Sequence, residues 1–437
     1  MASETEIAKY QKENLLLKKQ IKERTGKTVD RLYEERAKRV RDVIELREPD
    51  RVPFMVLVEP HHYSGIPKTA AFYDPITLKR TMRKMAVDLE PDMGESGFPS
   101  CGAAMTELDV QNCVWPGGPK PPDYEYQFIE GEYMKEDEYD MFLNDPSGFM
   151  IRRYLPRVYK ALAPLAKLPP LDGIFMGFEH LTPFFADPEF LQMAGHLAES
   201  GRLVNEFRRN VGDAHEDLAQ LGFPPFARFA PGGVGGAPFD TVTSFLRGMK
   251  GSMLDMYRRP YKLLQACEVI LEKRIACAVP ADPNAREYPP RVGMPLWRGD
   301  PVFMSEAQFK KFYWPGLKKS LKTHIDLGYV PVPFFEAAFG DRLEYLLELP
   351  KGGILASVEA ADAVRAKEIL GGHTSLLVRC PNVCKLWSVG QLESFIKDLI
   401  DKCGNGGGLI IVVKMPDNTR IEDMQAMMKS IKEYGKY

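Results

Sequence analysis

Three consecutive apolar segments of the chain end in residues of the kinds that bind metal ions. Glu336 ends VPVPFFE, Glu359 ends GILASVE and Cys380 ends TSLLVRC, a spacing of Glu-x22-Glu-x20-Cys. If these segments are neighbouring strands of one parallel sheet, about 4.8 Å separates adjacent strands, and the three side chains meet at one edge. Zn²⁺ accepts carboxylate and thiolate ligands, and a catalytic zinc ion keeps a fourth position open. The spacing therefore predicts a zinc site.

The charges of this predicted site indicate what the metal would do. Two carboxylates and one thiolate leave the ion a strong Lewis acid, able to polarise an oxygen atom of a substrate. The alternative is that the two glutamates are acid–base or hydrogen-bonding groups and that Cys380 is a packing residue. Glu344, His373 and Cys384 are nearby substitutes if one of the three ligands is misassigned.

Residues at other predicted strand ends give weaker signals. Pro60-His61-His62-Tyr63 follows the first strand, where His62 is a candidate acid or base, although each histidine is equally typical of a loop. Trp297 and Arg298 end another strand and could offer a substrate an aromatic wall and a charged partner. Residues 232–240 (GGVGGAPFD) lack the spacing of a phosphate-binding loop, and we interpret them as a tight turn that lets a ligand approach the backbone.

Short β-rich segments alternate with helix-length segments from Arg51 onward, and this order predicts βαβ units and a parallel sheet. We predict a single (β/α)₈ TIM-type barrel, an α/β fold with its active site at the C-terminal ends of the strands. A further candidate strand, 85–89, makes nine candidates for eight places, and it and 226–230 are the weakest. The eight main candidates are 52–59, 173–178, 226–230, 291–297, 330–336, 353–359, 374–380 and 408–414.

The chain is predicted to consist of an N-terminal helical extension, residues 1–48, and a barrel, residues 49–437, with an insertion at about 98–160. One face of the first helix has the spacing of a coiled-coil seam: Ile7, Tyr10, Asn14, Leu17 and Ile21. This seam favours a helix that lies on its own domain. The alternative is a contact between the two chains of a homodimer.

Composition narrows the class of protein. The 437 residues include 58 Lys and Arg against 60 Asp and Glu, and a net charge of −2 excludes the global basic field of a nucleic-acid-binding protein. Seven widely spaced cysteines suit a reducing cytosol better than a disulfide framework. No stretch approaches the roughly 18 uncharged apolar residues that a membrane span needs. We expect a cytoplasmic enzyme with a small-molecule substrate.

Over about residues 30–437 the chain resembles the uroporphyrinogen decarboxylase superfamily, which contains the heme-pathway decarboxylase and zinc methyltransferases that work with corrinoid proteins. The decarboxylase carries an Arg-containing motif after its first strand, where this chain has Pro60-His61-His62-Tyr63, so the resemblance favours the methyltransferases. The matching stretches are ERAKRVRDVIELREPDRVPF, PFDTVTSFLRGMKGSMLDMYRRPYKLLQACE, FMSEAQFKKFYWPGLKKSL, VPVPFFEAAFGDRLEYLLELPKG, AKEILGG and GNGGGLIIV.

The chain departs from the thiol-activating methyltransferases of this superfamily. Those enzymes carry His-x-Cys where this chain has Phe334 and Glu336, so a thiol substrate is not expected. The set Glu336, Glu359 and Cys380 is similar to the ether-cleaving branch, the methyltransferase I component of veratrole-type aryl O-demethylases. That resemblance implies a zinc-assisted transfer of a methyl group from a methoxylated aromatic, of the veratrole or guaiacol type, to the Co(I) corrinoid (cobalamin) of a partner protein.

In this interpretation Glu336 is catalytic as well as a zinc ligand, and Phe334, Phe335 and Trp297 form apolar walls around the aromatic ring, with Arg298 beside them. Three alternatives remain open. The first is a related methyltransferase that uses tetrahydrofolate, a methylamine or betaine as its substrate. The second is a decarboxylase-type lyase, and the third is a binding protein without catalysis.

Overall fold

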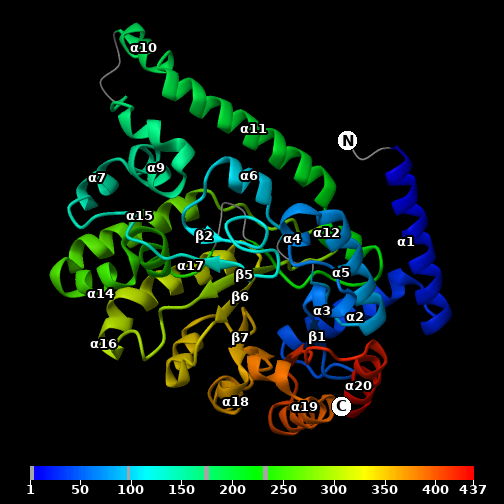
Figure 1. The fold of residues 1–437 in the computed structure, drawn as a ribbon. Coiled ribbons are helices and arrows are strands. Elements are labelled where there is room, and N and C mark those ends of the chain that lie inside the picture. The colour runs from blue at the N-terminus through cyan, green and yellow to red at the C-terminus, as the bar shows by residue number, and fades with distance from the viewer. Residues whose placement is uncertain (1–3, 96–98, 172–176, 230–234) are drawn as a thin grey trace.

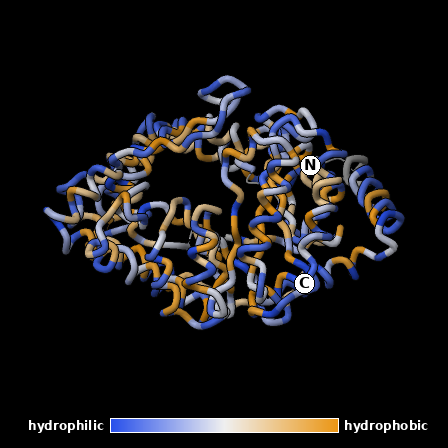
Figure 2. The backbone as a smooth tube through the Cα atoms, turned by 90° about the horizontal axis from the view of Figure 1, so that it is seen from below, coloured by the Kyte–Doolittle hydropathy of each residue, from blue (hydrophilic) through white to orange (hydrophobic). Residues whose placement is uncertain are grey.

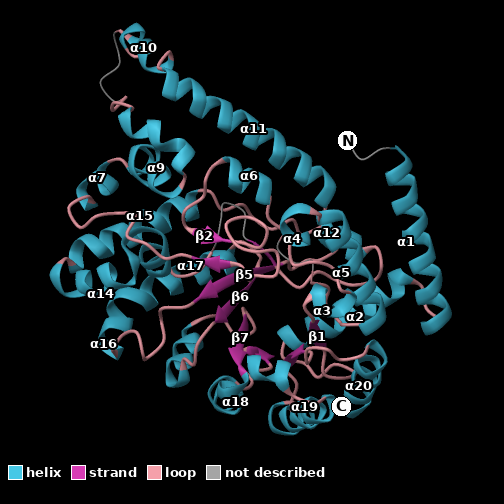
Figure 3. Cartoon of the chain, in the orientation of Figure 1, coloured by secondary structure: helices cyan, strands magenta, loops and turns pink. Residues whose placement is uncertain are grey.

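The computed structural model describes residues 4–95, 99–171, 177–229 and 235–437. At the centre lies a curled sheet of parallel strands, and helices surround it (Figures 1 and 3). Helices α10 and α11 lie along one outer edge of the molecule, and α1 lies on another side of it (Figure 1). The alternation of strands and helices that the sequence predicts is therefore confirmed.

The sheet contains seven strands in the order β1-β9-β8-β7-β6-β5-β4, and every neighbouring pair is parallel. The first and last strands of the chain therefore lie side by side, as they do in a sheet that curls toward a barrel. The strands are β1 (Phe54–Leu57), β4 (Arg228–Phe229), β5 (Arg291–Leu296), β6 (Val330–Phe335), β7 (Leu355–Glu359), β8 (Ser375–Arg379) and β9 (Leu409–Lys414). The predicted barrel is confirmed only in part, because the described residues contain no eighth strand in this sheet.

A short non-strand segment lies between the two edges of the sheet. The Asp92 N–H donates to the carbonyl oxygen of Phe54 in β1 over 2.7 Å. The Gly94 N–H donates to Pro224 O over 2.8 Å, and the Phe226 N–H donates to Gly94 O over 3.1 Å. Residues 92–94 therefore connect β1 to the residues that lead into β4.

Helices supply most of the remaining structure. Those before residues 92–94 are α1 (Glu4–Thr25), α2 (Val29–Ile44), α3 (Pro60–Ser64), α4 (Ala70–Tyr73) and α5 (Pro75–Leu89). Those before β4 are α6 (Gly102–Glu107), α7 (Tyr139–Asn144), α8 (Pro146–Phe149), η1 (Met150–Tyr154), α9 (Leu155–Val158), η2 (Lys160–Lys167), η3 (Phe178–His180), α10 (Thr182–Phe185), α11 (Pro188–Val211) and α12 (Ala214–Ala219).

The helices after β4 pack around the second half of the sheet, and the long helical segments predicted there are present, several of them broken into shorter pieces. They are α13 (Pro238–Thr241), η4 (Val242–Arg247), α14 (Gly248–Arg258), α15 (Pro260–Ala276), α16 (Glu306–Gln308), η5 (Phe309–Tyr313), α17 (Trp314–Asp326), η6 (Gly340–Glu348), η7 (Ala360–Asp362), α18 (Ala363–Leu370), η8 (Asn382–Leu386), α19 (Val389–Cys403) and α20 (Ile421–Tyr434).

Two of the predicted strands have a different outcome. Residues 85–89 are the last turn of α5, and Met85 and Leu89 are buried at the i, i+4 spacing of a helix face, so this strand prediction is wrong. Of the predicted strand 173–178, residues 173–176 lie outside the described part of the chain. Phe178 begins the 3₁₀ helix η3.

The strands have two buried faces. Successive side chains point to opposite faces of a sheet, so alternate residues face the inside of the curl. The inner cluster includes Met55, Val332, Leu355, Leu377 and Val412. The outer cluster, between the sheet and the helices, includes Phe54, Phe335, Val358, Val378 and Val413. Apolar segments are accordingly gathered in the interior of the molecule (Figure 2).

The predicted seam of α1 packs on its own chain. Asn14 accepts a 2.6 Å hydrogen bond from Arg83 of α5, and the same guanidinium lies 3.9 Å above the Tyr10 ring. Ile21 is 2% exposed. The side chain of Ile7 lies outside the described residues. These contacts confirm that α1 lies on its own domain. A homodimer stays a prediction, and its interface would have to use residues other than this seam.

Candidate active site

The register of neighbouring strands decides which strand-end residues face the inside of the sheet. Glu359 of β7 pairs with Arg379 of β8, and Phe334 of β6 pairs with Ser357 of β7. Leu355, four residues before Glu359, belongs to the inner cluster. Because side chains alternate, Glu359 and its cross-strand neighbour Arg379 also face inside, at the C-terminal ends of their strands.

Arg379 joins three strands at this inner edge. Its buried guanidinium donates to the carbonyl and hydroxyl oxygens of Ser357 over 2.7 Å each and to Glu359 Oε1 over 2.8 Å. It also donates to the carbonyl oxygen of Phe335 and lies 3.8 Å from the centre of the Phe334 ring. Five contacts hold this cation, so it is a fixed positive charge in the candidate site.

Glu336 directly follows β6, and its N–H donates to Leu296 O of β5 over 2.9 Å. Its carboxyl group makes no hydrogen bond or ion pair with any residue in the described part of the chain. The side chain as a whole is exposed, but the surrounding wall partly desolvates the carboxyl, and this raises the pKa of Glu336 above its ordinary value. Arg379 and Arg298 oppose the shift without cancelling it. Glu336 is therefore an available carboxyl that holds its proton more tightly than usual.

Cys380 lies on the other side of the sheet. It directly follows Arg379, so it has the opposite phase, and it is fully buried in the outer cluster. Its thiol contacts the thiol of Cys384, and this contact together with burial raises the pKa of Cys380. The predicted ligands Glu336, Glu359 and Cys380 therefore do not converge.

These residues do not fit a single zinc ion. Glu359 is already paired with Arg379, whose cation would repel a metal at the same place. No group of three or more His, Cys, Asp or Glu side chains in the ranges that the structure describes could hold a metal ion. The predicted ligand set is therefore corrected, and zinc binding stays a prediction without a site.

The substitute ligands do not complete the set. Glu344 is exposed on η6, 3.9 Å from Arg365. His373 precedes β8, at the opposite end of that strand from the candidate site, and its Nδ1 lies 3.0 Å from Thr374 Oγ1. Cys384 is buried beside Cys380 in the outer cluster.

Two other predicted site residues do not share a space with the Glu336 side chain, one because of its distance in the sheet and one because it faces the other side of its strand. His62 Nε2 is 3.3 Å from Asp417 Oδ1, beyond the end of β9, and three strands separate β1 from β6 in the sheet. Phe335 is 2% exposed and packs against Phe339 with ring centres 4.5 Å apart in the outer cluster. Phe335 is thus a core residue, and the inward-facing Phe334 is the aromatic wall that β6 provides.

Asp240 fixes the backbone that follows β5, a role that sequence reasoning missed. Its carboxyl is 2% exposed and accepts hydrogen bonds from the Tyr313 hydroxyl at 2.8 Å and the Arg298 N–H at 3.0 Å. It also accepts from the Trp297 N–H at 3.3 Å, and burial raises the pKa of Asp240 to about 7. The Trp297 indole N–H donates to Ser244 Oγ over 2.7 Å. Trp297 and Arg298 are therefore held in place from two sides.

The insertion contributes a hairpin, β2 (Cys113–Val114) and β3 (Gln127–Phe128), that reaches these loops. Glu130 forms an ion pair with Arg298 and accepts from the Met249 N–H. Phe128 packs edge-on against Phe245 of η4 with ring centres 5.2 Å apart. The hairpin therefore lies against the rim of the candidate site beside β5.

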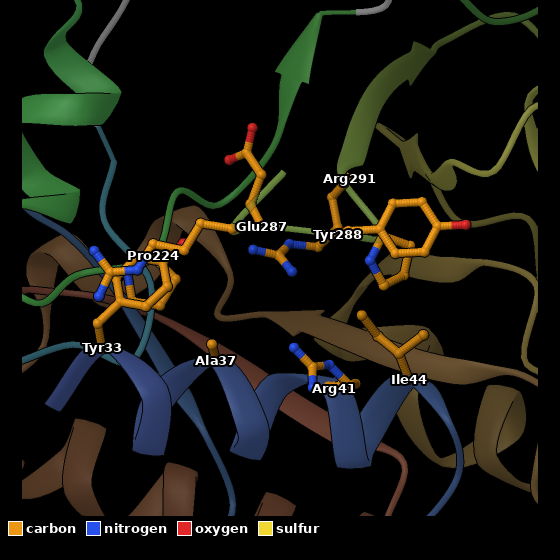
Figure 4. A pocket seen from close by; sticks show the side chains of 10 residues that line it. Tyr33, Ala37, Arg41, Ile44, Pro224, Glu287, Tyr288 and Arg291 are labelled. Carbon is orange, nitrogen blue, oxygen red and sulfur yellow. The ribbon is translucent and has the colours of Figure 1, made fainter. Parts of the chain in front are cut away.

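Two further cavities do not form part of this site. One, of about 20 Å³, lies between α2 and the N-terminal end of β5 and has room for about one water molecule (Figure 4). Tyr33 and Arg41 of α2 and Tyr288 and Arg291 line it (Figure 4). The other is an open groove of about 700 Å³ between α16 and η6. Neither cavity contains Glu336, Glu359 or Arg379.

Comparison with known structures finds a similar fold in another protein. The chain is similar in structure to a methyltransferase from Methanosarcina mazei, with a TM-score of 0.52 and 15% sequence identity over 91% of this chain and 98% of that one. No protein-family model and no curated protein sequence matches the chain. At this identity the likeness shows a shared fold.

No helix in the described ranges is both long enough and apolar enough to cross a membrane.

Proposed function

We propose that the chain is a methyltransferase that removes the methyl group of a methoxylated aromatic at the C-terminal edge of the curled sheet. One observation carries the proposal: Glu336 presents an unpaired carboxyl of raised pKa beside the inward-facing Phe334 and the fixed cation of Arg379. An aryl methyl ether needs a proton or a positive charge at its oxygen, because phenoxide leaves poorly. The fold shared with a methyltransferase supports the same class of reaction.

The chemical step is a displacement at the methyl carbon. A nucleophile forms the new bond to that carbon with its own electron pair, and the electrons of the carbon–oxygen bond go to the aryl oxygen. Glu336 donates its proton to this oxygen, and the resulting carboxylate regains a proton from water. Arg379 stabilises the negative charge that develops on the oxygen, an interaction that strengthens in the transition state. Phe334 holds the ring.

The methyl acceptor in this proposal is the Co(I) corrinoid of a partner protein, which supplies a strong nucleophile. The fold supports an approach from the C-terminal edge of the sheet, where Glu336 and Arg379 lie.

We further propose that residues 92–94 take the place of a second strand and close the barrel, because they hydrogen-bond to both edges of the sheet. No step of the proposal needs a zinc ion held by Glu336, Glu359 and Cys380.

The test combines the purified chain with guaiacol and free cob(I)alamin as the probe acceptor. Methylcobalamin is followed by its visible spectrum, and catechol is followed by chromatography. We expect equal amounts of the two products and a much slower reaction without the protein. Glu359→Gln is a matched variant at the same edge that leaves Glu336 intact, and it should retain more activity than Glu336→Gln. Turnover with betaine or a methylamine but with no aryl ether would contradict the proposal.

A further inference from the structure

A cavity of about 140 Å³ lies at the C-terminal end of β1, which three strands separate from β6 and Glu336. Its walls come from three parts of the chain that are far apart in sequence. The segment after β1 contributes His61 and Phe72, α5 contributes Leu78, and the insertion contributes Tyr126. The hairpin thus encloses a space that β1 and its following loop leave open.

Most of this wall is apolar. Ile66, Ala71 and Leu78 line the cavity together with two aromatic rings. Those rings, Phe72 and Tyr126, lie 6.3 Å apart between centres at an angle of 19°. An apolar cavity of about 150 Å³ is large enough to bind benzene. A single aromatic ring therefore matches the size and the lining of this cavity.

His61 is the polar group that remains available in this wall. Its ring packs against His62 at 4.1 Å, and its nitrogens make no hydrogen bond with any residue that the structure describes. Burial, His62 and Lys68 lower the pKa of His61, so the imidazole is neutral at pH 7, with one donor and one acceptor nitrogen. Lys68, by contrast, already forms an ion pair with Glu125 of the insertion.

We propose that this cavity is a second ligand site, which binds a neutral single-ring aromatic with one hydroxyl or ether oxygen. The ring lies among Phe72, Ala71 and Tyr126, and its oxygen forms a hydrogen bond with His61. A charged ligand is disfavoured, because the charged residues of the lining already form ion pairs, Lys68 with Glu125 and Glu59 with Lys385. The site does not depend on methyl transfer at Glu336, from which three strands separate it.

The test measures binding by ligand-observed NMR and calorimetry, with phenol and toluene as probes, and needs no activity. We expect phenol to bind with a dissociation constant on the order of 1 mM, as so small a ligand allows. Phenol should bind about fivefold more tightly than toluene, since one net hydrogen bond is worth about 1 kcal/mol. His61→Phe should abolish that preference and keep ring binding.

Two variants locate the bound ring. Ala71→Leu fills the cavity and should weaken phenol binding at least about tenfold, whereas Ala198→Leu on the exposed face of α11 should not change it. If Ala71→Leu does not fold, Tyr126→Ala removes one wall and should weaken binding severalfold. Equal phenol affinity in all folded cavity variants, or loss of binding in Glu336→Gln alone, would overturn the proposal. So would the absence of phenol binding to the unaltered chain at concentrations of about 10 mM.

Discussion

Arg379 and Glu359 face each other across neighbouring parallel strands, and the Arg379 guanidinium donates to Glu359 Oε1 over 2.8 Å. The positive charge of the guanidinium also limits the rise in the pKa of Glu336, so it acts on both carboxyl groups. A fixed organic cation thus lies where the residue spacing predicted a metal ion. This arrangement makes Glu336 the available acid of the site and leaves Glu359 to hold Arg379 in position.

The pH dependence of methyl transfer should follow the protonation of Glu336. Desolvation raises the pKa of this carboxyl, and only the protonated form can donate. Activity should therefore be full below the raised pKa and fall as the pH rises through it. Initial rates between about pH 5 and pH 9 measure this profile. Glu336→Gln should lose this fall in activity, and a rate that increases over the same range in the unaltered protein would contradict the assignment.

Arg379 should be important for stability. Its guanidinium is 3% exposed and makes hydrogen bonds to the two neighbouring strands β6 and β7. Arg379→Met leaves Glu359 and the Ser357 oxygens without these partners and should lower the free energy of unfolding by about 3 kcal/mol. Urea titration measures the loss. Arg365→Met, which removes an exposed ion pair with Asp341, is the control and should cause no measurable change. Equal effects of the two substitutions would refute the prediction.

Asp240 should make the protein less stable as the pH rises from about 4 to 7. Its pKa is raised from 3.8 to about 7, so the folded state keeps a proton that the unfolded state loses. Stability is then full below the unfolded pKa and decreases through the folded pKa, by up to about 4 kcal/mol. Asp240→Asn cannot ionise and should show a smaller decrease. Denaturant titrations at pH 4.5 and 7.5 compare the two proteins, and parallel decreases would exclude this role.

Cys380 should not affect metal content. Its thiol is buried in the outer cluster beside Cys384, on the opposite face from Glu336. Cys380→Ser should therefore have the same zinc content and nearly the same methyl transfer rate as the unaltered chain. Elemental analysis after purification in zinc-containing medium measures the first quantity. One zinc ion per chain that disappears in this variant would restore the three-ligand site.

The error over Cys380 has a physical cause. In TSLLVRC the residues Leu376, Leu377 and Val378 are all apolar because both faces of β8 are buried. No alternation in the sequence then tells which strand-end residue faces inside. The phase comes from the pairing of Arg379 with Glu359, a relationship between two strands that one strand's sequence does not contain. A one-residue change of phase moves every side chain to the other face.

The parts of the fold and of the candidate site that could be predicted are those that depend on the residue pattern of a short segment. The strands from β5 to β9 were found because short apolar segments end at turn residues, and Glu336 and Glu359 were found because they end such segments. Asp240 could not be found, since its role depends on Tyr313 and the backbone after β5. The strand predicted at 85–89 failed because a buried helix face has a similar apolar composition.

The central claim is that Glu336 gives its proton to the departing aryl oxygen. Rates of methyl transfer to cob(I)alamin from guaiacol and from 4-nitroanisole, in the unaltered chain and in Glu336→Gln, test it most directly. A nitrophenoxide leaves without help from an acid, whereas the oxygen of guaiacol needs the proton. The account predicts that Glu336→Gln slows the guaiacol reaction by about 10²–10⁴-fold and the 4-nitroanisole reaction far less. An equal loss with both ethers, or no loss with guaiacol, would contradict it.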